Sequence, residues 1–260
     1  MAELSVSKQD IIDGLRRVGL KRGANVIVHS SLSAFGKVDG GADSVVDAMI
    51  EIVDKNVGTI IMPCFTYDWQ PGQRFDWTQA QSTWTGKIPQ TFGERPGVKR
   101  GKHPLYNVAV LGPLADWVIS VNDLLPLSWG IDKFYYQIKD RNGSVLLLGV
   151  DHNSNSTIHV CQELADVPHI ANKKPMSKLT LDELMRKPPK EQEDIIELHM
   201  SSMETIRDFN KIEPILLAHK VQKITSIGKA TVRYMYSKDV IEIGTEALKK
   251  NPRLLVASKT

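Results

Sequence analysis

The stretch NVIVHSSLSAFGKVDGGADSVVDAMIEIVDKNVGTIIMP, residues 25–63, decides the fold class. Its two ends, residues 25–30 and 58–63, are short apolar runs that are typical of buried strands. Between them, residues 42–54 predict a helix with one apolar face, made by Val45, Val46, Met49, Ile50 and Val53. A strand, a helix and a second strand in this order predict an α/β architecture.

The same alternation continues along the chain. Residues 7–20 predict a helix that Ser7 caps, with Ile11, Leu15 and Val18 on its buried face. Further strands are expected at residues 106–113, 144–150 and 230–236, and further helices at residues 131–140, 207–220 and 238–250. We therefore expect a central, mostly parallel sheet flanked by helices in a single domain, residues 1–260, with an α+β extension over residues 176–260.

Composition narrows the function classes. The chain has 260 residues, of which 42% are hydrophobic and 24% charged, as in ordinary globular proteins. No apolar run approaches the roughly 20 residues that cross a bilayer, and the N-terminus lacks the apolar stretch of a signal peptide, so we expect a cytoplasmic protein. The net charge of +3 comes without a basic block, which disfavours nucleic acid and membranes as partners. Two distant cysteines do not make a disulfide framework.

Residues 64–104 interrupt the alternation. The segment carries Trp69, Trp77 and Trp84 among Gly, Pro, Gln and Thr, and a loop of this length in a compact domain is usually functional. We interpret it as an excursion that covers a substrate. It holds six basic residues against three acidic ones, whereas a site for polycationic molecules usually has the reverse balance.

The stretch LLLGVDHNSNSTIHVCQE, residues 146–163, sets polar residues behind a buried strand, where open α/β sheets place their ligands. A helix that starts near Ser156 or Thr157 puts His159 and Glu163 four residues apart on one face. A carboxylate beside an imidazole favours its protonated form, as a general base requires. The alternative is an ordinary surface pair, and a metal site of His152, His159 and Glu163 lacks the tight HExxH spacing.

Residues 28–43, VHSSLSAFGKVDGGAD, form a small-residue loop between the first strand and a helix N-terminus. Backbone N–H groups in such a loop can approach a phosphate closely, aided by the helix dipole. The loop matches neither a Walker A motif nor a dinucleotide GxGxxG motif, so a tight turn without a ligand remains the alternative.

Together with GTIIMPCFTYDW, PGVKRGKHPLYNVAVLGPLADWV and IGKATVRYMYSKDVIEIGTEALKKNP, these motifs resemble the aminoglycoside 3-N-acetyltransferase family, also called the antibiotic N-acetyltransferase family. The resemblance covers residues 11–252. It implies transfer of an acetyl group from acetyl-coenzyme A to a primary amine of an aminoglycoside or amino-sugar-like acceptor, on a fold distinct from the GNAT acetyltransferases. No metal is required. The small-molecule partners are therefore acetyl-coenzyme A and the amine, and a homodimer is left open.

The resemblance also implies roles for individual residues. His159 with Glu163 is expected to act as the general base, and His152 is the second choice. The coenzyme side is expected to comprise the loop residues Ser30, Ser31, Leu32, Ser33, Ala34, Gly40 and Gly41. His103 of the HP dipeptide is expected to be either a coenzyme-side or a structural residue. The acceptor side rests on the excursion itself and not on the resemblance: it is expected to include Thr66, Asp68 and Trp69, with Asp68 near the acceptor ammonium.

Two further expectations concern the stabilisation of the oxyanion and the charge of the acceptor. Direct attack on a thioester creates an oxyanion, for which loop amides or a hydroxyl of Ser31, Ser156 or Thr157 could be the donor. The net-basic excursion predicts a smaller or less cationic acceptor than the deoxystreptamine antibiotics. A hydrolytic or catalytically altered relative that keeps the coenzyme-binding fold is the alternative function.

Overall fold

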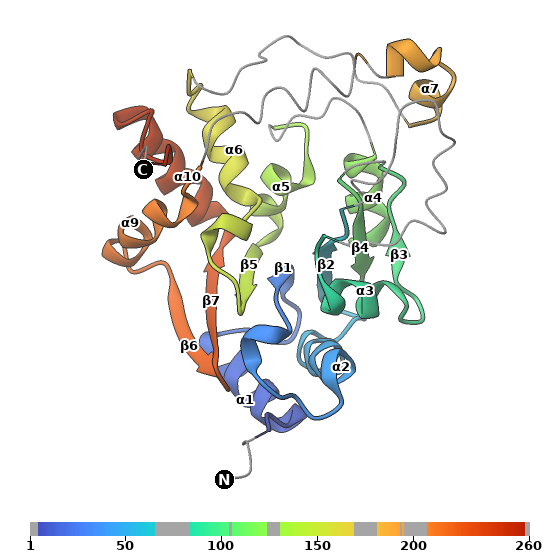
Figure 1. Cartoon of the computed structure of the whole chain (residues 1–260), viewed down its shortest axis with the longest axis vertical. Coiled ribbons are helices and arrows are strands. Elements are labelled where there is room, and N and C mark those ends of the chain that lie inside the picture. Colours follow the sequence, from blue (N-terminus) through green and yellow to red (C-terminus); the bar gives the residue numbers. More distant parts are fainter. Residues whose placement is uncertain are drawn as a thin grey trace.

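The chain forms a mixed α/β fold around one seven-stranded sheet (Figure 1). The structure, a computed structural model, describes residues 5–65, 84–103, 106–123, 131–168, 181–192, 194 and 207–257. The strands lie side by side in the order β3-β4-β2-β1-β5-β7-β6. Their bounds are β1 (Asn25–Ser30), β2 (Thr59–Pro63), β3 (Lys99–Arg100), β4 (Val108–Leu111), β5 (Gly143–Leu148), β6 (Lys223–Ile227) and β7 (Ala230–Tyr236).

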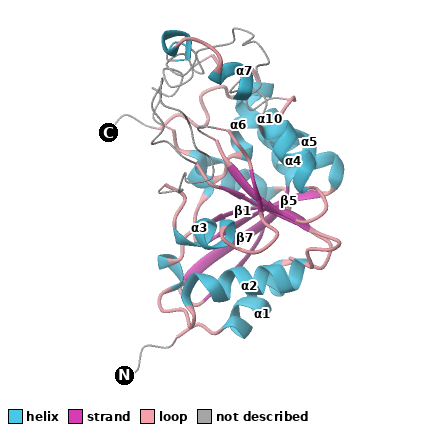
Figure 2. Ribbon diagram, turned by 90° about the vertical axis from the view of Figure 1, so that its right-hand side faces the viewer, coloured by secondary structure: helices cyan, strands magenta, loops and turns pink. Residues whose placement is uncertain are grey.

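The helices cover both faces of this sheet (Figure 2). The α-helices are α1 (Lys8–Val18), α2 (Gly41–Val53), α3 (Lys87–Gly93), α4 (Ala115–Asn122), α5 (Phe134–Gln137), α6 (Thr157–Leu164), α7 (Leu181–Met185), α9 (Glu213–Ala218) and α10 (Ser237–Lys250). Short 3₁₀ turns are η1 (Ser33–Phe35), η2 (Ile138–Arg141), η3 (His152–Ser154) and η5 (Phe209–Ile212).

The expectation of a mostly parallel sheet is wrong. Only the pairings β1–β2 and β1–β5 are parallel, whereas β2–β4, β3–β4, β5–β7 and β6–β7 are antiparallel. The strand, helix and strand of residues 25–63 do give a parallel pair, because a crossover helix connects them. β6 and β7 are joined by residues 228–229 alone, and such a short connection makes an antiparallel hairpin. β6 and β3 had not been predicted.

Alternation along β1 divides the core between the two faces. Val26 and Val28 pack with α1 and α2, whereas Ile27 packs with α4, α5 and Val160 of α6. This follows from the period of two in a strand. The next residue on the face of Ile27 is His29, at the carboxyl end of the strand.

Local sequence signals explain the helix ends. Ser7 caps α1 as predicted, in a capping box in which its side chain accepts from the Asp10 N–H and Asp10 accepts from the Ser7 backbone. The helix expected at residues 131–140 is shorter, because α5 passes into η2. The region of residues 207–220 divides in the same way into η5 and α9.

The helix that carries His159 is fixed by close packing against α10 (Figure 1). Gly244 of α10 faces Cys161 of α6, and a Cβ atom at position 244 would lie 2.7 Å from the Cys161 Sγ atom. A larger residue would therefore force the two helices apart. In the described part of the chain, no helix is both long and apolar enough to cross a membrane.

Candidate active site

A cavity of about 900 Å³ lies at the carboxyl ends of β1, β2 and β5. The serine-rich loop after β1 and the polar loop after β5 form opposite parts of its wall. Its lining residues are Val28, His29, Ser30, Ser31, Leu32, Ser33, Gly36, Pro63, Phe65, Trp84, Thr85, Gly86, Lys87, Pro89, Val150, Asn153, Ser154, Asn155, Ser156 and His159. The two stretches singled out in the sequence thus meet in one place, and the volume suits a small molecule.

The serine-rich loop is held against the β5 loop by the backbone. The Ser31 N–H donates to the Leu148 carbonyl oxygen at 3.0 Å. Gly149 has a φ of +76°, and a Cβ atom there would lie 2.7 Å from the Cβ of Ala34, so only glycine permits this approach. Ala34 therefore serves the packing of the loops and is absent from the cavity lining, whereas Ser30 to Ser33 belong to it.

Gly40 and Gly41 lie at the start of α2 and are not among the cavity-lining residues. Both have positive φ angles, +74° and +59°. A Cβ at position 40 would lie 2.4 Å from the Ser44 Oγ, whereas one at position 41 would meet no atom within 4 Å. Their glycine identity is thus explained by backbone conformation.

His159 lies on the first turns of α6, half-buried, and lines the cavity. Its Nδ1 atom is 3.2 Å from the side-chain oxygen of Gln162, and its ring makes an edge contact with Phe209 at a centroid distance of 5.0 Å. Gln162 is fully buried, whereas Glu163, one residue further, is exposed. The ring of His159 therefore has a partner, the amide of Gln162, that was not predicted from the sequence.

His152 occupies a different environment, since it is fully buried and does not line the cavity. Its Nδ1 lies 3.3 Å from the Asn155 side-chain nitrogen, and its Nε2 lies 2.7 Å from the Gln222 side-chain oxygen. An amide nitrogen only donates and an amide oxygen only accepts, so Nδ1 accepts from Asn155 and Nε2–H donates to Gln222. Burial lowers the pKa of His152.

The network continues beyond this ring into the C-terminal part of the chain. Gln222 donates to Glu213 at 2.7 Å, and Glu213 accepts from the Arg233 Nε at 2.6 Å. The Asn210 side chain accepts from the His152 backbone N–H and donates to Asp151. The loop after β5 is thus tied to η5, α9 and β7, which is a structural role for His152.

His103 is also a buried histidine away from the cavity lining. Its Nδ1 accepts from the Tyr106 backbone N–H at 2.9 Å. Nearby, both carboxylate oxygens of Asp123 accept from the Lys102 backbone N–H at 2.9 Å. Burial raises the pKa of this carboxyl group. These contacts hold residues 101–103 and Tyr106 in place.

The three predicted acceptor-side residues, Thr66, Asp68 and Trp69, lie outside the described residues. On the described part of the excursion, the charge count needs a correction. Arg95 pairs with Asp43 and Asp47 of α2 at 2.8 and 2.9 Å, and Lys99 pairs with Asp116 at 2.6 Å. Acids outside the excursion thus neutralise two of its bases, so the net charge of the segment does not describe the charge at the cavity.

His29 and Asn155 also line the cavity. Neither residue was predicted from the sequence to have a specific role. Asn155 is fully buried, and its side-chain oxygen accepts from the Thr157 N–H at 3.1 Å. His29 is buried, and burial lowers its pKa to about 3. The sequence feature that could have indicated His29 is its position as the one histidine in the apolar strand NVIVHS.

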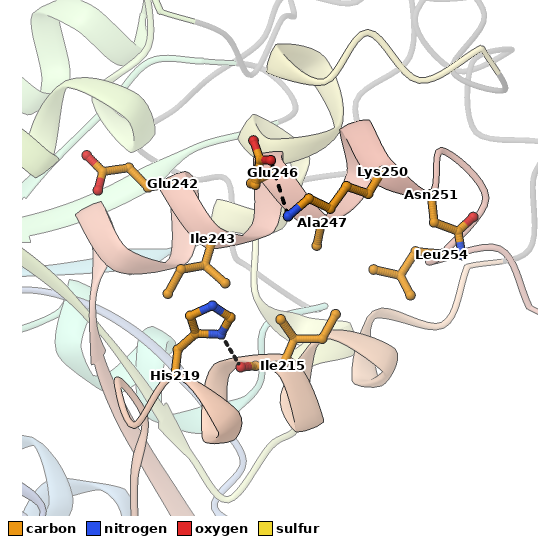
Figure 3. Close-up of a pocket in the computed structure, with 9 residues that line it drawn as sticks. All are labelled: Ile215, His219, Glu242, Ile243, Glu246, Ala247, Lys250, Asn251 and Leu254. Carbon is orange, nitrogen blue, oxygen red and sulfur yellow. Dashed lines mark hydrogen bonds and ion pairs between the residues drawn. The ribbon is translucent and has the colours of Figure 1, made fainter.

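A second, smaller groove of about 500 Å³ lies between α9 and α10 (Figure 3). Aliphatic side chains of Ile215, Ile243 and Leu254 dominate its lining. Its polar groups already have partners: Lys250 lies 3.4 Å from Glu246, and His219 Nδ1 donates to the Ile215 carbonyl oxygen at 2.8 Å. Among the described residues, no group of three or more His, Cys, Asp or Glu could hold a metal ion.

The fold and the cavity define an α/β protein with a cavity of small-molecule size at the carboxyl ends of its parallel strands. A sequence profile described as Aminoglycoside 3-N-acetyltransferase matches residues 27–249. The chain therefore belongs to the aminoglycoside 3-N-acetyltransferase family, whose members are acyltransferases.

Individual relatives agree with this membership. The chain is 31% identical over 194 residues to the SPbeta prophage-derived aminoglycoside N(3')-acetyltransferase-like protein YokD of Bacillus subtilis, covering 64% of this chain and 68% of that protein. Alignments with aminoglycoside N(3)-acetyltransferases III, IV and IX span 60% to 63% of their lengths.

Solved structures share the fold over nearly the whole chain. The apoenzyme of aminoglycoside acetyltransferase AAC(3)-IVa superposes with a TM-score of 0.77 and 24% identity, covering 99% of this chain and 94% of that one. A binary complex of AAC-IIIb with CoASH superposes with a TM-score of 0.72 and 18% identity, covering 99% and 100%.

Proposed function

We propose that this chain transfers the acetyl group of acetyl-coenzyme A directly to a primary amine of an aminoglycoside or amino-sugar-like acceptor. The observation that carries the proposal is the cavity in which the Ser30–Ser33 loop and His159 meet, in a member of this family. Relatives named as aminoglycoside acetyltransferases, and one solved with CoASH, support the substrate classes.

His159 is proposed as the general base. An alkylamine near pH 7 is mostly protonated and lacks the lone pair that attacks a thioester, so a base must remove its proton. The Gln162 amide oxygen accepts from Nδ1–H, so Nε2 is the ring nitrogen that carries the lone pair, and Nε2 is proposed to receive that proton. Gln162 is neutral, so any negative charge that stabilises the imidazolium must come from elsewhere, and Glu163 remains the proposed source.

The Ser30–Ser33 loop is proposed to hold the pantetheine arm. Its serines face the cavity, and Gly149 and Ala34 keep it beside the β5 loop. Gly40 and Gly41 are proposed for the diphosphate, because α2 begins at Gly41 and a helix N-terminus favours an anion. For His103, the buried contact with the Tyr106 N–H favours a structural role over contact with the coenzyme.

The acceptor side is proposed to include Thr66, Asp68 and Trp69, which follow β2 in the excursion. The preference for a smaller, less cationic amine stays a prediction. That prediction rests on the net positive charge of residues 64–104. The ion pairs of Arg95 and Lys99 weaken it, because these two positive charges are already compensated. A direct comparison of acceptors must therefore decide between antibiotics and simple amino sugars.

The test is a screen of aminoglycosides and amino sugars with acetyl-coenzyme A, in which free thiol is followed and the acetylated amine is identified by mass spectrometry. The His159→Gln variant and a reaction without acceptor are the controls. Amine-dependent thiol release supports the transferase. Thiol release that needs no amine indicates a hydrolase, and no release with any amine, despite coenzyme binding, contradicts the proposal.

A further inference from the structure

His29 is a buried histidine at the carboxyl end of β1, the central strand of the sheet. Successive side chains of a strand point to opposite faces, so His29 shares a face with Ile27. Ile27 packs in the cluster that includes Val160 of α6. The His29 side chain therefore projects on the α6 side of the sheet, one strand repeat nearer to the cavity than Ile27.

The imidazole of His29 lines the cavity, and its Nε2 is buried without a hydrogen-bond partner in the structure as described. Buried polar atoms almost always have partners, so an unpartnered one in a cavity wall points to a missing ligand atom. Because burial lowers the pKa of His29 to about 3, the ring is neutral near pH 7. A neutral imidazole carries one N–H donor and one lone pair.

We propose that His29 is a further catalytic residue, whose Nε2–H donates a hydrogen bond to the carbonyl oxygen of the acetyl thioester. The proposal rests on the proposed function, since it assigns a donor for that same reaction. β1 thus supplies a donor at the oxygen side of the cavity, and α6 supplies His159 for the amine side. Donors aimed at developing charge are among the largest contributions to catalysis.

The step balances without a further reactant. The amine nitrogen forms a bond to the carbonyl carbon, and the carbonyl π electrons move to the oxygen, which becomes the oxyanion that His29 holds. Two protons leave the nitrogen: His159 first passes the ammonium proton to solvent, which frees the lone pair, and then takes the second proton as the carbon–nitrogen bond forms. The oxyanion then collapses, the carbon–sulfur bond breaks, and the thiolate of coenzyme A leaves and receives the proton from His159.

Other donors fit this role less well. The Ser31 and Ser33 hydroxyl oxygens lie 3.2 Å apart, so one hydroxyl donates to the other and only the accepting one keeps its hydrogen for a ligand. The Thr157 hydroxyl is buried and does not line the cavity. Ser30 and Ser156 do line it, and the Ser30 hydroxyl is, like the His29 Nε2, buried without a hydrogen-bond partner in the structure as described. Ser30→Ala and Ser156→Ala are therefore the variants that must be compared with those of His29.

The test compares the full-length wild type with His29→Gln and His29→Asn, using acetyl-coenzyme A and the best acceptor from the screen. A glutamine amide nitrogen reaches near the Nε2 position, whereas the shorter asparagine does not. We expect His29→Asn to lower kcat by about a hundredfold, the usual loss for one oxyanion donor, and His29→Gln to recover part of it. The KM for acetyl-coenzyme A and the acidic limb of the pH profile should stay where the wild type has them.

Several results would overturn the assignment. Wild-type turnover in His29→Asn, or equal losses in both variants, indicates a packing role. Loss of the acidic limb makes His29 a base, and a larger fall in Ser30→Ala, Ser156→Ala or Thr157→Val moves the donor to that hydroxyl. If His29→Asn does not fold, His29→Phe is measured in its place, because phenylalanine keeps an aromatic ring but has no N–H donor. An inactive wild type refutes the proposed function itself, whatever His29 does.

Discussion

The two regions on either side of the loop after β5 use histidine in opposite ways. In the buried network, both ring nitrogens of His152 have partners from the protein, Asn155 and Gln222. In the cavity wall, the Nε2 of the equally enclosed His29 has none in the described structure. Burial lowers the pKa of both rings, so burial alone does not distinguish them.

The difference lies in where the hydrogen-bond partners come from. A ring whose partners the fold supplies stabilises the fold, and its loss should be measured as stability. A ring that lines a cavity without such a partner is available to a ligand, and its loss should be measured as turnover. Measurements of turnover and of the free energy of unfolding therefore distinguish the two kinds of histidine.

The largest effect is expected for His159, the cavity histidine of α6. His159→Gln should lower turnover by about a hundredfold or more, within the usual range for a general base, because His159 is the group proposed to take the proton of the amine. Binding of acetyl-coenzyme A, measured by isothermal titration, should change little. The free energy of unfolding should also change little, since the ring is only half-buried.

The matching control is His152→Gln. A severe loss of turnover in this variant with a mild effect of His159→Gln would reverse the comparison and make His152 the base. Loss of coenzyme binding in His159→Gln would instead place His159 on the coenzyme side of the cavity.

The second effect concerns stability. His152→Leu removes the ring between Asn155 and Gln222 and leaves their buried amide groups without it, so we expect the free energy of unfolding to fall by about 1–3 kcal/mol. Urea denaturation measures this. His219→Leu is the control, because His219 is exposed on the surface of α9 and its loss should cost much less. If the two variants were equally stable, the network would not contribute as we infer.

The third effect is a pH dependence of stability that His29 should impose. Its pKa falls from 6.5 in the unfolded chain to about 3 in the folded protein, so between these values only the unfolded chain binds the proton. Stability is therefore lost as the pH falls below about 6.5, at about 1.4 kcal/mol per pH unit for this one group. His152 contributes in the same direction.

Urea denaturation of the wild type and His29→Gln at pH 7, 6 and 5 measures this slope. The variant should lose stability less steeply on acidification, because it lacks one proton-binding site in the unfolded chain. Parallel slopes would mean that His29 titrates normally in the folded protein and is not enclosed.

The sequence predicted the parts of the fold that local patterns specify. Ser7 with Asp10 defines the start of α1, and the apolar face of α2 follows from its spacing. Strand direction was not predictable in the same way, because it depends on how each connection crosses the sheet. Short runs such as residues 223–227, largely exposed at the sheet edge, carry no buried-strand pattern.

The same limit applies to the site. His159 and the serine loop were found because each belongs to a contiguous polar stretch after a strand. His29 was not singled out, because the cavity that it lines is assembled from segments far apart in the sequence, which a local pattern does not reveal. Gln162 was missed because helix neighbours occur at both i+3 and i+4, and spacing alone does not choose between them.

The smallest effect on activity is expected for the two cysteines, which belong to the fold and not to the cavity. Both are buried, and burial raises the pKa of each thiol to about 12, so almost no thiolate exists near pH 7. Neither lines the cavity, and the Cys161 Sγ lies 3.4 Å from the Val240 carbonyl oxygen in the α6–α10 contact. Cys64→Ala and Cys161→Ala should therefore keep wild-type turnover, with a stability loss of about 1 kcal/mol, typical of a buried truncation. Mass spectrometry of the enzyme after exposure to acetyl-coenzyme A should find no acetyl group on either thiol. An adduct on one of them, formed and consumed at the rate of turnover, would establish a covalent route and move that cysteine into the active site.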